Sequence, residues 1–153
     1  MIHPTAIIED CEIGEGTNVW AFTHICKGAK IGKDCTIGEG VYIGPDVIIG
    51  DRCRIQSHAL LYTGVEMGND VFIGPGVVTT NDHYPELPVG DWSERFMKTI
   101  IEDKASIGAN ATIVCGIIIA ENSMVGAGSV VTTFVSKNQI VVGNPAKHLK
   151  WKE

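Results

Sequence analysis

The sequence predicts an all-β fold, a parallel β-helix of about six triangular coils, and three observations support this prediction. Eighteen six-residue blocks, thirteen in residues 1–78 and five in residues 101–130, each open with an aliphatic residue or Met. The second position of these blocks is often Gly, and the fifth is nearly always small or β-branched. A repeat of six fits neither the period of an α-helix nor that of a long strand, but it fits a short strand followed by a bend.

The opening residue of each block is expected to fill the interior of the column, and the second and fifth positions are also expected to face inward. Three blocks make one coil, and coils stacked at a strand spacing of about 4.8 Å cover one another's aliphatic side chains. No coil is then stable alone. Gly is expected at the bends, because a Cβ there would clash or resist a positive φ. The opening residues are Met1, Ile7, Ile13, Val19, Ile25, Ile31, Ile37, Ile43, Ile49, Ile55, Leu61, Met67, Ile73, Ile101, Ile107, Ile113, Ile119 and Val125.

Three of the five cysteines, Cys11, Cys35 and Cys53, occupy the small fifth position, where a thiol packs as a compact apolar group. The odd number and the irregular spacing of the cysteines fit neither a disulfide framework nor a zinc site. Cys26 and Cys115 lie at other positions of the repeat, and the pattern leaves their role open.

Length and charge narrow the class of protein. The 153 residues suffice for one domain, 1–153, with its own core. A net charge of −6 argues against nucleic acid or an anionic membrane as a partner, because either would call for a basic face. No apolar run reaches the roughly 18 residues that a membrane span needs, and the first ten residues do not form a secretion signal. We therefore expect a cytoplasmic protein that acts on a small molecule.

The repeat is interrupted once, at residues 79–100, and a C-terminal cap is expected at 131–153. The interruption of 22 residues is not a multiple of six, so the chain must leave the column and return. Its entry concentrates polar groups, with Asn81, Asp82 and His83 in sequence. A projecting loop of this kind reaches across to a neighbour and closes a cleft, so we predict that it carries the function. A solvated loop without function is the alternative.

The [Ile/Val/Leu]-Gly-x-x-small-x repeat resembles that of the hexapeptide-repeat acyltransferases and covers about 108 residues of the chain. The resemblance implies a left-handed parallel β-helix, against the usual right-handed rule for parallel crossovers. It also implies a homotrimer, with acetyl-coenzyme A as co-substrate in the groove between neighbouring columns. No metal is expected.

A narrower resemblance is carried by NVWAFTHICKGAKIG, RCRIQSHALLYTGV, the loop entry TTND, ASIGANATIVCG and VVGNPAK. These segments are similar to those of bacterial nucleotide-sugar N-acetyltransferases. The resemblance implies acetylation of the amino group of a dTDP- or UDP-linked amino-deoxy sugar, by direct transfer at a subunit interface and in the service of polysaccharide biosynthesis.

His83 is the first candidate for the catalytic base, because imidazole titrates near neutral pH and accepts a proton from the attacking amine. The family carries an essential His in this loop just before a proline, and here Tyr84 stands between His83 and Pro85. The resemblance also implies that Asn81 orients the sugar amine. In some relatives the coenzyme sulfur takes the proton, which would make His83 dispensable. Asp82 either pairs with the sugar's ammonium group or forms a turn.

Three further residues are candidates for substrate binding. Relatives that acetylate amino-uronates tend to have an Arg shortly after the Asn, which pairs with the sugar carboxylate. This chain has Glu86 there, so we expect a neutral amino-dideoxy sugar. His24 and His58, 34 residues apart and so about two coils, are both expected to face outward and to line an intersubunit cleft.

Coenzyme binding is assigned by resemblance to the last coils. The pantetheine arm of related enzymes lies beside small residues, which implicates Gly108, Ala109, Gly126 and Ala127. Lys147, in the Gly-Asn-Pro-Ala-Lys ending, is the candidate contact for the coenzyme's phosphates.

Other functions are compatible with the same fold. An O-acetyltransferase of serine or a sugar would use the same base and groove. A γ-class carbonic anhydrase requires three His around zinc, and the closely spaced pair of that family is missing here. A structural β-helix without catalysis would lack coenzyme binding.

Overall fold

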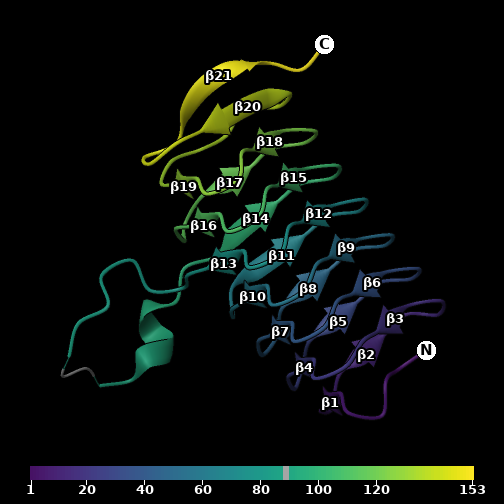
Figure 1. Cartoon of the computed structure of the whole chain (residues 1–153). Coiled ribbons are helices and arrows are strands. Elements are labelled where there is room, and N and C mark those ends of the chain that lie inside the picture. Colours follow the sequence, from purple (N-terminus) through teal and green to yellow (C-terminus); the bar gives the residue numbers. More distant parts are fainter. Residues whose placement is uncertain (88–89) are drawn as a thin grey trace.

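The computed structural model describes residues 1–87 and 90–153 as a three-sided column of short parallel strands from which one loop projects (Figure 1). The predicted all-β fold class is confirmed, and the architecture is consistent with the left-handed parallel β-helix of the resembling family. Within the described residues, no helix has the length and apolar character needed to cross a membrane.

Successive strands belong to three sheets in turn, which form the three sides of the column. The first sheet contains β1 (Ile7–Ile8), β4 (His24–Ile25), β7 (Tyr42–Ile43), β10 (Leu60–Leu61), β13 (Val78–Thr79), β16 (Thr112–Ile113) and β19 (Val130–Val131). The second contains β2 (Glu12–Ile13), β5 (Lys30–Ile31), β8 (Ile48–Ile49), β11 (Val65–Met67), β14 (Thr99–Ile101) and β17 (Ile118–Ile119). The third contains β3 (Asn18–Val19), β6 (Thr36–Ile37), β9 (Arg54–Ile55), β12 (Phe72–Ile73), β15 (Ser106–Ile107), β18 (Met124–Val125), β20 (Gln139–Val142) and β21 (Lys147–Trp151).

The core is the stack of block-opening side chains inside the column. Ile37, Ile55 and Ile73 of the third sheet lie directly above one another and are 0% exposed. The fifth position is also buried, as predicted, and Cys35 and Cys53 pack there as free thiols. Burial of this continuous aliphatic stack is the main source of stability, because no coil covers its own apolar face.

The second position does not face the interior as predicted. Its glycines lie at the bends, against the backbone of the next coil. A Cβ on Gly14 would lie 2.5 Å from the carbonyl carbon of Gly32, and a Cβ on Gly32 would lie 2.6 Å from that of Gly50. Glycine is required there because the backbones of neighbouring coils approach too closely for any side chain.

The predicted register is wrong in the first two blocks. Ile8, not Ile7, is opposite Ile25, and Ile2, not Met1, is opposite Val19. Met1 and Ile7 are therefore on the outside, at 61% and 59% exposed. Ile13, the next strand residue that faces inward, follows Ile8 by five positions instead of six, so the bend between them is one residue shorter than the repeat requires.

The column has about seven coils rather than about six, because the first sheet contains seven strands. Thr79 and Val131, which lie outside the counted blocks, take inward positions and are 0% and 1% exposed. The projecting loop accordingly spans residues 80–98 rather than 79–100. After it, β14 aligns with β11 in the regular register, with Thr99 opposite Val65.

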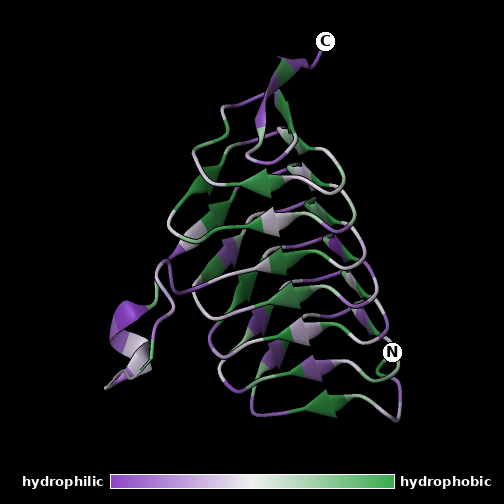
Figure 2. Ribbon diagram, turned by 60° about the vertical axis from the view of Figure 1, so that its left-hand side comes forward, coloured by the Kyte–Doolittle hydropathy of each residue, from purple (hydrophilic) through white to green (hydrophobic). Residues whose placement is uncertain are grey.

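The C-terminal segment closes one end of the column. β20 pairs in parallel with β18 and antiparallel with β21, and the turn between them contains Gly143 and Pro145. Figure 2 shows this hairpin at the C-terminal end of the stacked coils and the loop projecting from one side. The hairpin covers the strand edge that β18 would otherwise expose.

Candidate active site

The base of the loop of residues 80–98 is fixed by a backbone hydrogen bond within the loop and by threonine side chains that accept hydrogen bonds from the column. The Met97 N–H donates to the Asn81 carbonyl oxygen at 2.8 Å, which holds the entering and leaving strands together. The Cys115 N–H donates to Thr80 Oγ1 at 3.0 Å, and the Tyr62 N–H donates to Thr79 Oγ1 at 3.0 Å. Asn81 is thus placed on the column edge rather than at the loop tip.

Inside the loop, Asp82 and Arg95 form an ion pair. Arg95 Nε lies 3.1 Å from Asp82 Oδ2, and these side chains are 28% and 11% exposed. Asp82 Oδ1 accepts the Tyr84 N–H at 2.9 Å, the turn alternative considered for this residue. The guanidinium also donates to the carbonyl oxygens of Tyr84 and Glu86. Both carboxylate oxygens of Asp82 are therefore engaged within the loop, and its contact with substrate stays a prediction.

Replacing Arg95 with alanine is expected to speed cleavage of the loop by chymotrypsin about tenfold. The substitution removes a charge-assisted hydrogen bond worth roughly 1.5–3 kcal/mol, which lowers the free energy of local opening. The loop carries aromatic cleavage sites such as Trp92 and Phe96. Arg54→Ala, which removes a guanidinium from β9 on the column, serves as the matched control. Equal cleavage rates in the two variants would contradict the anchoring role of Arg95.

His83, the residue after Asp82, is exposed. Its ring packs edge-on against Tyr84, with ring centroids 4.7 Å apart. Together with Asp82, Arg95 and Met97, these two residues line a hollow of about 470 Å³. The imidazole forms no hydrogen bond with any residue that the structure describes, so both ring nitrogens are available to a ligand.

A second hollow, of about 280 Å³, lies on the other side of the loop base. Asn81 and Asp82 line it together with two threonines and with aromatic and apolar groups: Thr79, Thr80, Tyr62, Val78, Pro85 and Trp92. An amide and aromatic rings in one hollow suit a sugar or a nucleobase. Glu86 is absent from this lining and is exposed, with its carbonyl oxygen directed at Arg95.

The structure does not bring His24 and His58 together. His24 is in β4 on the outer face of the first sheet, where its ring contacts Tyr42 edge-on at 5.8 Å. His58 is the fourth residue of its block and sits at a bend with φ of 60°. Its ring fills the space that a Cβ on Gly40 would take. That both line a cleft between subunits stays a prediction.

His24 belongs to a cluster that the sequence did not indicate. Its Nε2 lies 2.7 Å from Glu9 Oε1 and 3.8 Å from Cys26 Sγ. The hydrogen bond to His24 and the Lys27 N–H lower the pKa of Glu9. A hydrogen bond with Cys26 and partial burial raise the pKa of Tyr42 to about 12.

The residues assigned to the coenzyme gather at one corner of the column. A Cβ on Gly108 would lie 2.5 Å from the Ala127 nitrogen, and the Gly128 N–H donates to the Ala109 carbonyl oxygen. Gly126 lies against the side chain of Val142, which is opposite Lys147 in the β20–β21 hairpin. Small residues and a cation are thus close together, as a pantetheine arm and its phosphates require.

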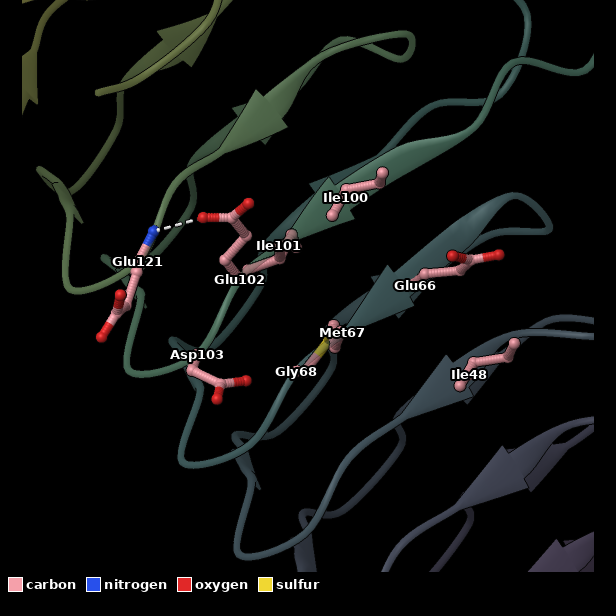
Figure 3. A pocket seen from close by; sticks show the side chains of 9 residues that line it. All are labelled: Ile48, Glu66, Met67, Gly68, Ile100, Ile101, Glu102, Asp103 and Glu121. Carbon is pink, nitrogen blue, oxygen red and sulfur yellow. Dashed lines mark hydrogen bonds between the residues drawn. The ribbon is translucent and has the colours of Figure 1, made fainter. Parts of the chain in front are cut away.

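A further hollow, of about 460 Å³, lies on the outer face of the second sheet (Figure 3). Ile48 and Ile100 contribute apolar surface, and the carboxylates of Glu66, Glu102 and Asp103 lie around them. Glu102 also accepts the Glu121 N–H at 2.8 Å. An acidic lining repels phosphate, so this hollow suits neither a nucleotide nor coenzyme A.

Sequence reasoning assigned no role to Arg95, Tyr62 or Glu9, which the structure places in the loop anchor, in the smaller hollow and beside His24. Arg95 is 13 residues from Asp82 in an irregular loop, and no periodicity predicts that contact. The sequence spacing could have indicated the contact of Glu9 with His24, because residues about one coil apart lie side by side in neighbouring coils.

Two family models match the chain. The bacterial transferase hexapeptide model matches residues 28–63 and 46–81, and the hexapeptide repeat of succinyl-transferase matches residues 6–45 and 98–133. A dTDP-3-amino-3,6-dideoxy-α-D-galactopyranose 3-N-acetyltransferase of Aneurinibacillus thermoaerophilus is 55% identical over 146 residues, which cover 95% of this chain and 75% of the relative. The chain belongs to the hexapeptide-repeat acyltransferases. The predicted resemblance to nucleotide-sugar N-acetyltransferases within this family is confirmed.

Solved acyltransferase structures show the same fold. PerB from Caulobacter crescentus, in complex with CoA and GDP-perosamine, is 23% identical with a TM-score of 0.58. The acetyltransferase domain of PglB from Neisseria gonorrhoeae, in complex with acetyl coenzyme A, is 21% identical with a TM-score of 0.66. Each match covers 97% of this chain, and the chain spans 56% of each of the two solved chains.

Proposed function

We propose that this protein is an acetyl-CoA-dependent N-acetyltransferase that acts on the amino group of a nucleotide-linked amino-deoxy sugar. The observation that carries the proposal is the 55% identity to a dTDP-amino-sugar N-acetyltransferase, which extends over 95% of the chain and so over both column and loop. The five free thiols and the nature of the substrates favour a cytoplasmic location.

We further propose a homotrimer with a reaction site at each subunit interface. The outer face of the first sheet supports this assembly, since Tyr42, Leu60, Val78 and Val130 lie along it in register with Thr112. A face with this apolar content is a typical protein contact. The loop, whose hollows lie at its base, would then complete the acceptor cleft against a neighbouring column.

The proposed chemistry is direct transfer without an acyl-enzyme. Asn81 orients the sugar amine, and His83 removes its proton as the amine attacks the thioester carbonyl. A backbone N–H near the return of the loop stabilises the oxyanion. The departing thiolate is the second candidate for the proton, because His83 has no partner among the described residues that would orient its ring.

Coenzyme binding is assigned to the corner that holds Gly108, Ala109, Gly126 and Ala127. Among the described residues, the N–H groups of Ala109 and Ala127 donate no hydrogen bond within the protein, so they are free to bond the pantetheine amides. Lys147 is opposite Val142 in the hairpin, and Val142 contacts Gly126, so the exposed Lys147 ammonium group lies next to this corner. Its positive charge suits the phosphates.

The loop favours a neutral sugar over a uronate. The loop contains the cation Arg95, but its charge is already balanced by Asp82. Arg95 also donates to the Tyr84 carbonyl oxygen. No free guanidinium in the described part of the loop remains for a sugar carboxylate, and the exposed Glu86 would repel one.

A coenzyme A release assay over a panel of acceptors tests the function. We expect activity with a dTDP-linked 3-amino-3,6-dideoxyhexose and much lower activity with a UDP-linked amino-uronate, because the described part of the loop offers a carboxylate no free guanidinium. Serine and an unmodified sugar serve as hydroxyl acceptors. Release of coenzyme A with serine alone would overturn the N-acetyltransferase assignment in favour of O-acetylation. A preference for the uronate would overturn the neutral-sugar assignment.

A further inference from the structure

The cluster of Glu9, His24 and Cys26 is formed by the stacking of two coils. His24 and Cys26 flank the inward Ile25, and the two-residue period of a strand places both on the outer face of the first sheet. Glu9 comes from the coil below, where Ile8 is opposite Ile25, so Glu9 falls beside Cys26. The three ligand atoms all lie within 4.8 Å of one another.

The geometry does not suit a catalytic triad. In a triad the acid and the nucleophile contact different nitrogens of the imidazole. Here Glu9 Oε1 and Cys26 Sγ both approach Nε2 of His24, at 2.7 and 3.8 Å. One nitrogen cannot donate its single proton to both groups at once. Three donor atoms within 4.8 Å of one another are instead an arrangement that one metal ion can bridge.

We propose that Glu9, His24 and Cys26 form a binding site for one Zn²⁺ ion. Zinc binds N, S and carboxylate O ligands at about 2.0–2.3 Å, and tetrahedral geometry then separates the N and S atoms by roughly 3.5 Å. The observed separation of 3.8 Å between Nε2 and Sγ is close to that value. The Glu9 oxygen, now hydrogen-bonded to His24, needs to move away by only about 0.5 Å.

The surroundings favour such an ion. Glu9 Oε2 accepts the Lys27 N–H at 2.7 Å, which fixes the carboxylate while Oε1 stays directed at His24. Water is the fourth ligand. The ion takes no part in the proposed acetyl transfer, and none of its three ligands lines the hollows at the loop.

Zinc binding is tested on the assembled, untagged protein by competition with a chromogenic chelator and by metal analysis after desalting. We expect one Zn²⁺ per chain. With Co²⁺ as the probe, we expect a thiolate-to-metal charge-transfer band. Loss of an outer-shell partner costs about 10–100-fold in affinity, so Cys26→Ser, which removes a ligand, is expected to weaken binding at least about 100-fold and to abolish the band.

Matched variants make the result decisive. Cys115→Ser removes another buried thiol, and Glu12→Gln removes another exposed carboxylate of the same coil, so both are expected to bind zinc normally. Glu9→Gln changes only an exposed side chain and remains informative if Cys26→Ser fails to fold. Zinc binding that Glu9→Gln and Cys26→Ser leave unchanged, a cobalt spectrum without a thiolate band, or no binding would each overturn the site. None of these outcomes bears on acetyl transfer, which the coenzyme A release assay measures separately.

Discussion

Replacing His83 with alanine is expected to lower kcat roughly 100-fold or more, which is the usual contribution of a general base. The exposed ring makes no hydrogen bond within the described residues and packs edge-on against Tyr84, so its removal is expected to leave the loop anchor intact. Steady-state rates with saturating acetyl-CoA and acceptor measure this effect.

His148→Ala is a close control for this experiment. Its ring is also exposed and also lies beside an aromatic ring, Trp151, with centroids 4.9 Å apart. It sits in the C-terminal hairpin and is expected to leave kcat unchanged. If His83→Ala retains full kcat, the departing coenzyme thiolate takes the proton and His83 is not the base.

Replacing Ile55 with alanine is expected to lower the free energy of unfolding by about 2–5 kcal/mol. Ile55 is fully buried between Ile37 and Ile73, and the strand hydrogen bonds of three coils fix the distance between these neighbours. The cavity therefore cannot collapse, and the cost falls at the upper end of the range for buried isoleucine. Urea unfolding followed by circular dichroism, at one protein concentration, measures it.

Ile48→Ala is the matched control on the outside of the column. Its side chain is 41% exposed on the second sheet, so the same deletion is expected to cost less than about 1 kcal/mol. Similar losses in the two variants would mean that the aliphatic stack is not the principal source of stability.

The sequence predicted the column well because one rule applies to almost every coil. Inward Ile or Val at six-residue spacing was sufficient to place the strands from Ile13 onward. The six-residue rule failed at Met1 and Ile7. The pair Ile7-Ile8 is compatible with two registers, and the shorter bend that follows places Ile8 inward instead of Ile7. The rule also missed Thr79, because a buried threonine does not match an aliphatic pattern.

The candidate site was less predictable, because contacts in an irregular loop have no period. The Asp82 and Arg95 pair joins the two ends of the loop, and only the folded backbone reveals it. The contact of Glu9 with His24 depends on a register that slips by one residue near the first coil. His58 shows the same difficulty, since a bend with positive φ directs its ring along the column rather than into a cleft.

The in-register return of the chain at Thr99 has a consequence for how acceptor choice changes. Elsewhere a short bend joins the first sheet to the second, and the loop of residues 80–98 takes the place of one such bend without displacing the strands on either side. Replacement of the whole segment by one of different length and chemistry would leave the scaffold's folding intact. Selectivity for a new sugar is thus separable from stability, and grafting this one segment is the economical route to redesign.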